Sequence, residues 1–471
     1  MTTLGADALG QNRLWPDGSG RRDGSSGGAA LLPRSAARRR SESTAWNLLR
    51  PVPILPICLC LIVASEFVFR VRAQDQTLGG SVDLQVALEV LVYGVAGIVL
   101  LTRVRPSRRG LHPALWALVA YLAITAMSAL SSPYPKVAQV RVAQLAITTL
   151  IALVLSQQAR PRDFHRFFAG YVLMIGLAAP VGLVYSKTAP IVAGRYTWLA
   201  VHPVNAANML GAAFVIAAAA ATDPRVLGGR LRRGPAVLLA IEIGGFLVAT
   251  KTRSAVGAAL VAALVCVWFI RPRGARVGVA VSAVLGVSLV AATSWSAVVD
   301  YVERGEGVEQ LESLNSRTNV WDAALELVKE SPITGRGYAA ARGVFLDRFG
   351  LGGAHNAFIE VAVNSGLVGL TALVALLVLV ALGLRWSRSS EFRRTERCLV
   401  AGIFGYFVIL ALTAGQLGQA ANVHVVFLAV VIGWIGVNAR DSGPADTAAS
   451  TSRRARATPV NPEAASSAGA S

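Results

Sequence analysis

The sequence contains few charged residues. Asp, Glu, Lys and Arg make up 15% of its 471 residues, whereas a soluble domain carries about 25%. Hydrophobic residues make up 54%, and the mean hydropathy is +0.54. One compact core could not bury this much apolar surface, which excludes an ordinary soluble domain. The composition indicates a polytopic membrane protein.

Cysteine and histidine are also scarce. Four cysteines and five histidines occur, and the spacing of the cysteines fits neither a disulfide framework nor a zinc site. His112, His165 and His424 have no His, Cys, Asp or Glu partner at ligand spacing. A glycine-rich phosphate loop and a G-x-S-x-G sequence are absent as well. We therefore expect neither a bound metal nor a cofactor.

Acidic residues are few beside basic ones. The chain has 26 acidic and 45 basic residues, a formal net charge of +19, and only four of the basic residues are lysines. Such a balance can indicate a nucleic-acid partner. Here the basic residues form short clusters between apolar segments, a pattern that orients membrane helices better than it forms a continuous phosphate-binding stripe. We expect no nucleic acid among the partners.

Long apolar stretches, in contrast, are abundant. Compared with the roughly 20 residues needed to cross a bilayer, they predict about twelve membrane helices. The predicted ranges are 52–69, 84–101, 111–130, 137–155, 167–185, 200–221, 235–250, 254–270, 275–293, 356–383, 396–415 and 422–438. The expected fold class is an all-α polytopic membrane protein in contact with the lipid bilayer.

The distribution of basic residues predicts the orientation of these helices. With twelve helices both termini lie on one side, and the tails and loops of that side hold 31 basic residues against 13 in the loops of the other side. Because Lys and Arg stay on the cytoplasmic side, both termini are expected there. The predicted organisation is a disordered cytoplasmic tail (1–45), helices 1–9 (46–293), a periplasmic loop (294–355), helices 10–12 (356–440) and a second disordered cytoplasmic tail (441–471).

The long loop is expected to contain one short amphipathic helix. Asn315 or Ser316 can cap this helix, and Pro332 would end it. Its predicted apolar face repeats at spacing four and three, through Trp321, Leu325 and Val328.

Basic residues on the predicted outer side indicate an anion site. Lys251 and Arg253 stand in a short turn before a helix, where free backbone N–H groups and the guanidinium favour the same anion. Arg195 precedes the sixth helix and Arg317 precedes the loop helix, and the arginine fork suits phosphate or carboxylate. The alternative for each residue is a solvated side chain or one that contacts lipid headgroups.

A polar stripe begins where the chain re-enters the predicted membrane. His355 is followed by Asn356, Glu360 and Asn364 at spacing four, on a strongly apolar helix. Polar groups there should face the bundle or a wet cavity. A histidine with its ordinary pKa of about 6.5 can act as a base at neutral pH. A histidine that only forms hydrogen bonds at the interface is the alternative.

Four ordered segments across 313–370 are more specific than any single residue. They are Asn315-Ser316-Arg317-Thr318-Asn319-Val320-Trp321, Ser331-Pro332-Ile333-Thr334-Gly335-Arg336-Gly337-Tyr338, His355-Asn356-Ala357-Phe358 with Glu360, and Ser365-Gly366-Leu367-Val368-Gly369. In this order they resemble the O-antigen ligase and polysaccharide polymerase family of bacterial membrane glycosyltransferases. A weaker match covers Thr250 to Gly257, where this chain has Thr252-Arg253-Ser254 in place of a Ser-Arg-Gly-like turn.

The resemblance implies an inner-membrane enzyme of surface polysaccharide biosynthesis that acts at the periplasmic face. Its partners would be an undecaprenyl-diphosphate-linked glycan donor and a glycan or lipid acceptor. We expect His355 to be the catalytic base, and Arg253 and Arg317 to stabilise the leaving diphosphate. The expected substrate-binding residues are Arg195, Lys251, Arg336, Asn356 and Glu360.

Two alternatives remain open from the residues. A multi-pass transporter or a flippase for lipid-linked oligosaccharides would use Glu89 and Glu242 in an ion or proton pathway. Within the enzyme interpretation, ligase and polymerase break the same donor bond and differ only in the acceptor, which the residues do not identify.

Overall fold

The computed structural model is helical in every element that it describes. The described residues are 54–67, 84–104, 111–188, 194–197, 202–303, 317–349, 352–387, 394–413, 415, 417–418 and 422–441. The predicted tails lie outside these residues, apart from the backbone of Asp441, and so do the predicted helix caps Asn315 and Ser316.

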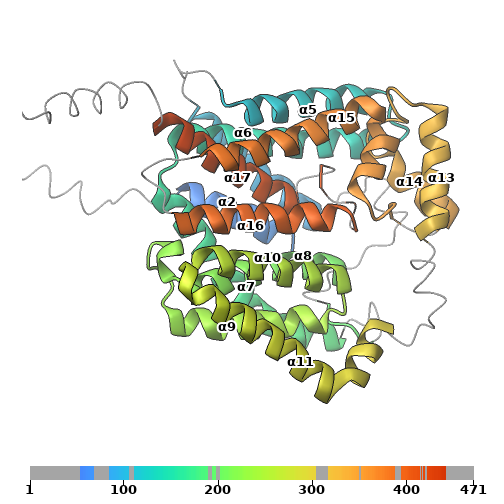
Figure 1. Cartoon of the computed structure of the whole chain (residues 1–471). Helices are drawn as coiled ribbons and strands as arrows, with labels where there is room; N and C mark the ends of the chain where they lie inside the picture. Colours follow the sequence, from blue (N-terminus) through green and yellow to red (C-terminus); the bar gives the residue numbers. More distant parts are fainter. Residues whose placement is uncertain are drawn as a thin grey trace, which may run out of the picture. The chain divides into compact units, whose positions relative to one another are not determined.

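Each of the twelve ranges predicted as membrane helices overlaps a helix of the structure (Figure 1). In chain order these are α2 (Ile54–Ser65), α4 (Leu84–Leu101), α5 (Pro113–Leu130), α6 (Pro135–Gln158), α7 (Pro161–Thr188), α8 (Pro203–Thr222), α9 (Arg233–Ala249), α10 (Arg253–Ile270), α11 (Arg273–Glu303), α15 (Ala357–Trp386), α16 (Arg394–Ala411) and α17 (Val423–Asp441). Among the described helices, α5, α6, α7, α8, α10 and α15 are long and apolar enough to cross a membrane. The chain is a multi-pass membrane protein, and the number of twelve crossings remains a prediction.

Proline and histidine set the start of two of these helices. Pro113 and Pro203 occupy the first positions of α5 and α8, where the missing N–H has no intrahelical partner to lose. The rings of His112 and His202 accept hydrogen bonds of 3.2 and 3.4 Å from backbone N–H groups of the first turn. Both rings therefore act as caps for orphan donors of the helix.

Small residues determine how closely the helices pack. The alanine-rich helix α8 contacts α7, α9, α10 and α16, and its short side chains let the neighbouring backbones approach. The hydroxyl of Tyr406 on α16 lies 3.2 Å from the carbonyl oxygens of Ala207 and Asn208 on α8. A methyl group at Gly211 would collide with the Tyr406 ring, so this contact needs glycine.

Large apolar side chains are exposed on several helices. Leu84 on α4 is 77% exposed, Leu177 on α7 is 76% exposed and Ile241 on α9 is 68% exposed. Exposure on this scale would be costly in water but suits contact with lipid chains.

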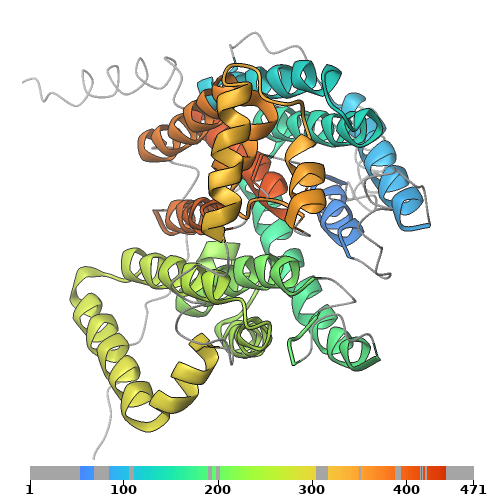
Figure 2. The ribbon, with the colours of Figure 1, turned by 90° about the vertical axis from the view of Figure 1, so that its right-hand side faces the viewer.

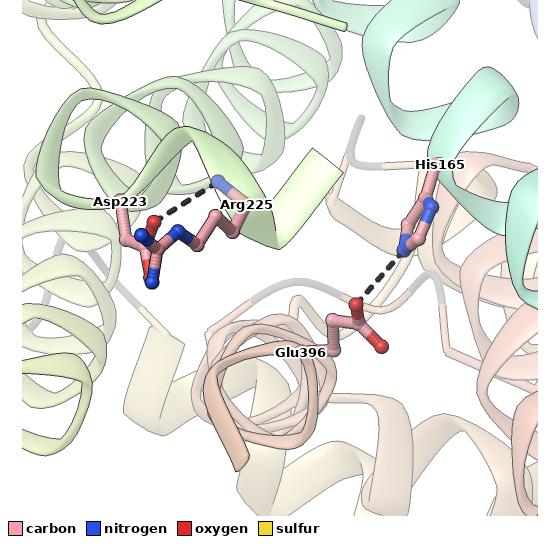
Figure 3. A network of polar contacts seen from close by, with 4 residues as sticks. All are labelled: His165, Asp223, Arg225 and Glu396. Atoms are coloured by element: carbon pink, nitrogen blue, oxygen red, sulfur yellow. Dashed lines mark hydrogen bonds and ion pairs between the residues drawn. The ribbon is translucent and has the colours of Figure 1, made fainter. Parts of the chain in front are cut away.

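A pair of polar side chains joins two helices at the end where α16 begins (Figure 3). His165 Nε2 on α7 and Glu396 Oε1 on α16 are 3.1 Å apart, and both side chains are largely buried. Nearby, the Asp223 carboxylate accepts a 3.0 Å hydrogen bond from the backbone N–H of Arg225 and caps the short 3-10 helix η2 (Pro224–Leu227). These contacts stabilise the end of the molecule opposite the start of α15.

The predicted loop over 294–355 is more helical than expected. Helix α11 continues to Glu303, with a non-helical residue at Ser294 where the loop was predicted to begin. The described part of this loop contains two short helices where one was expected, α13 (Arg317–Glu330) and α14 (Ala340–Phe349). Helix α13 ends directly before Ser331-Pro332, as predicted. Figure 2 shows α13 and α14 in front of the end of the helices at which α15 begins.

The predicted apolar face of α13 is partly wrong. Leu325 is 52% exposed, while Val320, Ala324 and Leu327 are buried, with Trp321 and Val328 packed beside them. The buried face lies against Phe345 of α14 and Val363 of α15. The face that a short helix buries depends on these partners, and the correct positions share the spacing that suggested Leu325.

Candidate functional site

Helix α15 is interrupted at Gly366, and the interruption organises the site. Gly366 has φ 64° and ψ −165°, a conformation that only glycine adopts without strain. The N–H of Leu367 donates to Pro332 O at 2.8 Å, and the N–H groups of Arg336 and Gly337 donate to the carbonyls of Val363 and Asn364 at 2.8 and 2.9 Å. The segment 332–337 therefore provides hydrogen-bond partners for backbone groups that have none within the interrupted helix.

Asn364 connects this interruption to three other elements. Its side-chain oxygen accepts the N–H of Ala341 at the start of α14 at 2.8 Å, and its carbonyl accepts the hydroxyl of Ser128 on α5 at 2.8 Å. Tyr338 is buried between the end of α5 and the start of α6, where its N–H donates to Ser128 O at 3.1 Å. Asn364, one residue of the predicted polar stripe, thus has a structural role.

His355 stands directly before the cap of α15. Its backbone has φ 54°, which is strained for a residue with a side chain. The side chain of Asn356 accepts the N–H groups of Phe358 and Ile359 and caps the helix, while its Nδ2 donates to Leu412 O at 3.3 Å. Asn356, which directly follows His355, is thereby held in place by α15 and by Leu412, which follows α16. The 352–356 segment is called the His355 loop below.

The side chain of Glu360 binds the His355 loop. Its side chain is buried, and its carboxylate accepts the backbone N–H of His355 at 3.1 Å and that of Ala354. Two glycines make room for the carboxylate, because a methyl group at Gly353 or at Gly415 would collide with Oε1. Glu360 therefore positions the loop that carries His355.

Two arginines that the sequence analysis did not assign to the site lie beside Glu360. Arg141 on the second turn of α6 and Arg342 on the first turn of α14 both interact electrostatically with the Glu360 carboxylate and with each other. Burial, followed by the charge of Arg141, lowers the pKa of Arg342 to about 10, while Glu360 opposes this shift. An ionisable residue inside a predicted membrane helix was a usable signal for Arg141. Arg342 lies in the predicted loop, where no motif or residue spacing in the sequence marked it as a site residue.

The residues of the predicted anion site form a second group, the basic turn, made of Arg195, Lys251 and Arg253. Arg195 donates from Nε to Thr250 O at 2.9 Å and from Nη2 to Thr252 Oγ1 at 3.1 Å. The turn separates α9 from α10, as predicted, and Arg253 is the first residue of α10. Neither 194–197 nor 249–254 contains an acidic residue, so the turn is strongly positive.

The surroundings of the basic turn respond to its charge. Burial, and then the charge of Arg195, lowers the pKa of His202, the cap of α8. A lowered pKa means that the ring favours its neutral form beside the arginine. Cations in this turn and the N-terminus of α10 together favour an anion.

The remaining predicted residues differ in what the structure says of them. Arg317 begins α13, and its side chain lies outside the described part of the structure. Arg336 forms an ion pair with Glu330, which compensates its charge, while its backbone N–H binds α15. His355, Asn356 and Glu360 are brought together at the start of α15, and Arg195, Lys251 and Arg253 at the α9–α10 turn. Figure 1 shows both places at the same end of the helices.

An apolar groove opens beside the interruption of α15. It has a volume of about 450 Å³ and is lined by α5, α15 and the 332–337 segment, through Ile124, Ile333, Leu367, Val368, Thr371, Ala372 and Ala375. Among the described residues no group of three or more His, Cys, Asp or Glu side chains could hold a metal ion. The chemistry available at this end of the molecule is a histidine, a buried carboxylate and several guanidinium groups.

Comparison with known proteins identifies a family segment in this part of the chain. Residues 236–374 match the family model described as O-antigen ligase. The matched residues run from α9 into α15 and include Arg253, Arg342, His355 and Glu360, whereas Arg141 and Arg195 precede them. No curated protein matches the chain significantly.

Proposed function

Residues 236–374 carry the O-antigen ligase family segment, and on this premise we propose that the protein transfers or polymerises undecaprenyl-diphosphate-linked glycan at the periplasmic face of the inner membrane. The family segment supports a glycosyl-transferring role in polysaccharide biosynthesis. The observation that carries the proposal is the placement of His355, fixed by Glu360 and Asn356, at the same end of the helices as the basic turn.

The proposed reaction is a single displacement. The imidazole of His355 takes the proton of an acceptor hydroxyl while that oxygen forms a bond to the anomeric carbon of the lipid-linked sugar. The bond between the anomeric carbon and the phosphate oxygen breaks, and the diphosphate leaves with the electron pair. One displacement inverts the anomeric configuration, so the stereochemistry of the product tests this step.

The basic turn suits the charge that grows on the leaving diphosphate. Arg253 and the N-terminus of α10 would bind it, with Arg195, Lys251 and Arg317 as further candidates. Preorganised donors of this kind are worth about 3 kcal/mol each in other enzymes. The apolar groove between α5 and α15 would accept part of the prenyl chain, because its lining has almost no polar side chain.

The proposal is tested with the purified full-length protein in lipid nanodiscs. Lipid-linked repeat units are supplied together with a candidate acceptor, without nucleotide and without an ion gradient, and the glycan is analysed by mass spectrometry. The proposal predicts a new glycosidic bond, with longer or transferred glycan. Movement of the lipid-linked substrate without any new bond would overturn it and indicate a flippase or another transporter.

A deletion strain distinguishes ligase from polymerase. Accumulation of single repeat units would indicate lost polymerisation, whereas accumulation of full-length lipid-linked polymer would indicate lost ligation. Complementation by the wild-type gene is the control for both results.

A further inference from the structure

Trp321 connects helix α13 to the loop that carries His355. The indole Nε1 of Trp321 donates a 2.9 Å hydrogen bond to the carbonyl oxygen of Ala354, the residue directly before His355. The side chain of Ala354 is buried in the cluster that α13 forms with α14 and α15. The spacing of residues in α13 predicts only an apolar role for Trp321. The hydrogen bond gives the indole N–H a second role, because it binds the backbone of the His355 loop.

Both polar groups of the peptide unit between Ala354 and His355 are bound by side chains. The carbonyl oxygen accepts the bond from Trp321 Nε1 at 2.9 Å, and the N–H donates to Glu360 Oε1 at 3.1 Å. Because a peptide unit is planar, one bond to each of these groups fixes the orientation of its plane. A rotation of the unit would break both bonds. The peptide before His355 is therefore held by two helices, α13 and α15.

The orientation of this peptide matters for the side chain of His355. A rotation of the peptide unit changes φ of His355, which is 54° in the structure, and φ relates the peptide plane to the Cα–Cβ bond. A positive φ costs free energy for a residue with a Cβ atom, so an unrestrained peptide would favour another orientation. The bonds from Trp321 and to Glu360 oppose this tendency. Without the bond from Trp321, we expect the peptide to rotate and the imidazole to move.

Trp321 is itself held by the packing of α13. The ring packs beside a cluster of buried side chains from α13, α14 and α15, which includes Val320, Ala324, Leu327, Phe345 and Val363. A donor on a packed helix holds its partner more precisely than a donor on a loop. Helix α13 can therefore serve as a support for the His355 loop.

We propose that Trp321 is a positioning residue that fixes the peptide between Ala354 and His355 and thereby places the His355 imidazole for the transfer reaction. The part that His355 takes in this reaction rests on the proposed function. Trp321 acts only through His355. A tryptophan that merely filled space in the cluster would stabilise α13 without any specific effect on His355.

Hydrogen–deuterium exchange tests the first step without any substrate. The purified full-length protein in nanodiscs is compared with Trp321→Phe, and the exchange of fragments that contain the His355 amide is followed by mass spectrometry. Phenylalanine keeps an aromatic ring in the cluster and lacks the N–H donor. We expect this amide to exchange about fivefold faster or more in Trp321→Phe, because its bond to Glu360 opens more often when the peptide can rotate.

Kinetics test whether Trp321 acts through His355. Trp321→Phe should lower kcat by about tenfold or more and leave KM for the lipid-linked donor within about twofold, because the base is misplaced while the donor still binds. The same substitution is then made in a His355→Ala protein. There it should change the residual rate by less than about twofold, since the residue that it positions is gone.

Two further proteins separate the hydrogen bond from the packing of the helix. Replacement of Trp321 by benzothienylalanine keeps the shape of the indole but puts sulfur in place of the N–H, and should reproduce both effects of Trp321→Phe. Val328→Ala removes apolar contacts from the same side of α13 and touches no polar group. It should lower the unfolding midpoint and leave kcat and the exchange at His355 within about twofold of the wild type.

The results decide the proposal in either direction. Faster exchange at His355, together with a loss of kcat that disappears in the His355→Ala background, supports it. Unchanged exchange in the folded benzothienylalanine protein, or an equal loss of rate with and without His355, would overturn it. The proposed function is judged separately by the glycosidic bond: a wild type that forms none contradicts the function, and the exchange data then still show whether Trp321 fixes the peptide. Transfer that needs His355 but is unaffected by Trp321→Phe contradicts only the role of Trp321.

Discussion

The backbone N–H of His355 donates a 3.1 Å hydrogen bond to the Oε1 atom of Glu360, five residues further along the chain. The spacing of five residues between His355 and Glu360 in the sequence thus corresponds to a direct contact in the structure. Glu360 lies on the first turn of α15, and His355 lies in the loop before it with a positive φ. A carboxylate that binds the loop backbone can hold the strained residue in place.

The first prediction concerns His355. His355→Ala should reduce product formation by about a hundredfold or more, because general-base help is typically worth this factor. Membrane insertion and the unfolding midpoint should change little, since the carboxylate of Glu360 binds the backbone and not the ring. Product is measured by mass spectrometry of the glycan.

The control for His355→Ala is His112→Asn, a substitution at the N-cap of α5. Asparagine keeps a capping oxygen for the helix, so activity should be close to that of the wild type. Normal product from His355→Ala would remove this residue from the role of base.

The second prediction concerns the room around Glu360. Gly415→Ala should destabilise the fold by about 1–3 kcal/mol and lower activity, because the added methyl group displaces the carboxylate that holds the His355 loop. Gly353→Ala should act in the same direction. Thermal unfolding and initial transfer rates are the measurements.

A neighbouring glycine serves as the control for this effect. Gly352 is exposed, and a methyl group there would meet no atom within 4 Å. Gly352→Ala should therefore leave stability and rate nearly unchanged. Equal effects at Gly352 and Gly353 would contradict the role assigned to Glu360.

The third prediction concerns the interruption of α15. Gly366→Ala should lower the free energy of unfolding by about 2 kcal/mol or more, because φ and ψ at this residue suit only glycine and the methyl group would collide with Ile333. Gly257→Ala in α10 is the comparison, since a methyl group there meets open space. That change should be neutral or slightly stabilising. A stable Gly366→Ala protein would mean that α15 tolerates a continuous helix.

The fourth prediction concerns pH and His202. Its pKa is lowered in the folded protein by burial and by Arg195, so the unfolded chain binds the proton first as the pH falls. The free energy of unfolding should therefore decrease below about pH 6.5. His202→Asn keeps a capping oxygen but does not titrate.

The measurement compares the unfolding midpoint at pH 7.5 and pH 5.5. We expect the wild type to lose more stability over this range than His202→Asn. Arg195→Gln should also reduce the loss, since it removes the charge that disfavours protonation. The same pH dependence in all three proteins would show that His202 does not contribute.

The helices themselves were predictable from local information. Apolar length and the proline and histidine at helix starts are properties of short segments, and every predicted membrane range overlaps a helix. The separation of α9 from α10 at Lys251-Thr252-Arg253 was predicted for the same reason. The polar stripe from Asn356 to Asn364 was visible as a spacing of four.

The roles of individual side chains were less predictable. Neither Arg141 nor Arg342 was assigned to the site, because nothing near either in the chain points to Glu360. Leu325 was placed on the buried face of α13, whereas its neighbours Ala324 and Leu327 are buried instead. Which side of a short helix is covered depends on Phe345 and Val363, which are distant in the sequence.

Sequence alone therefore determined the class of the protein, the positions of the helices that overlap the predicted membrane ranges and the candidates His355, Glu360 and Arg253, because hydrophobic length and residue spacing act within one segment. Tertiary structure decided that α15 breaks at Gly366 to bind residues 332–337 and that arginines of α6 and α14 meet at one carboxylate. Those contacts join segments tens to hundreds of residues apart, and their free energy depends on backbone groups and charges that become neighbours only when the chain folds.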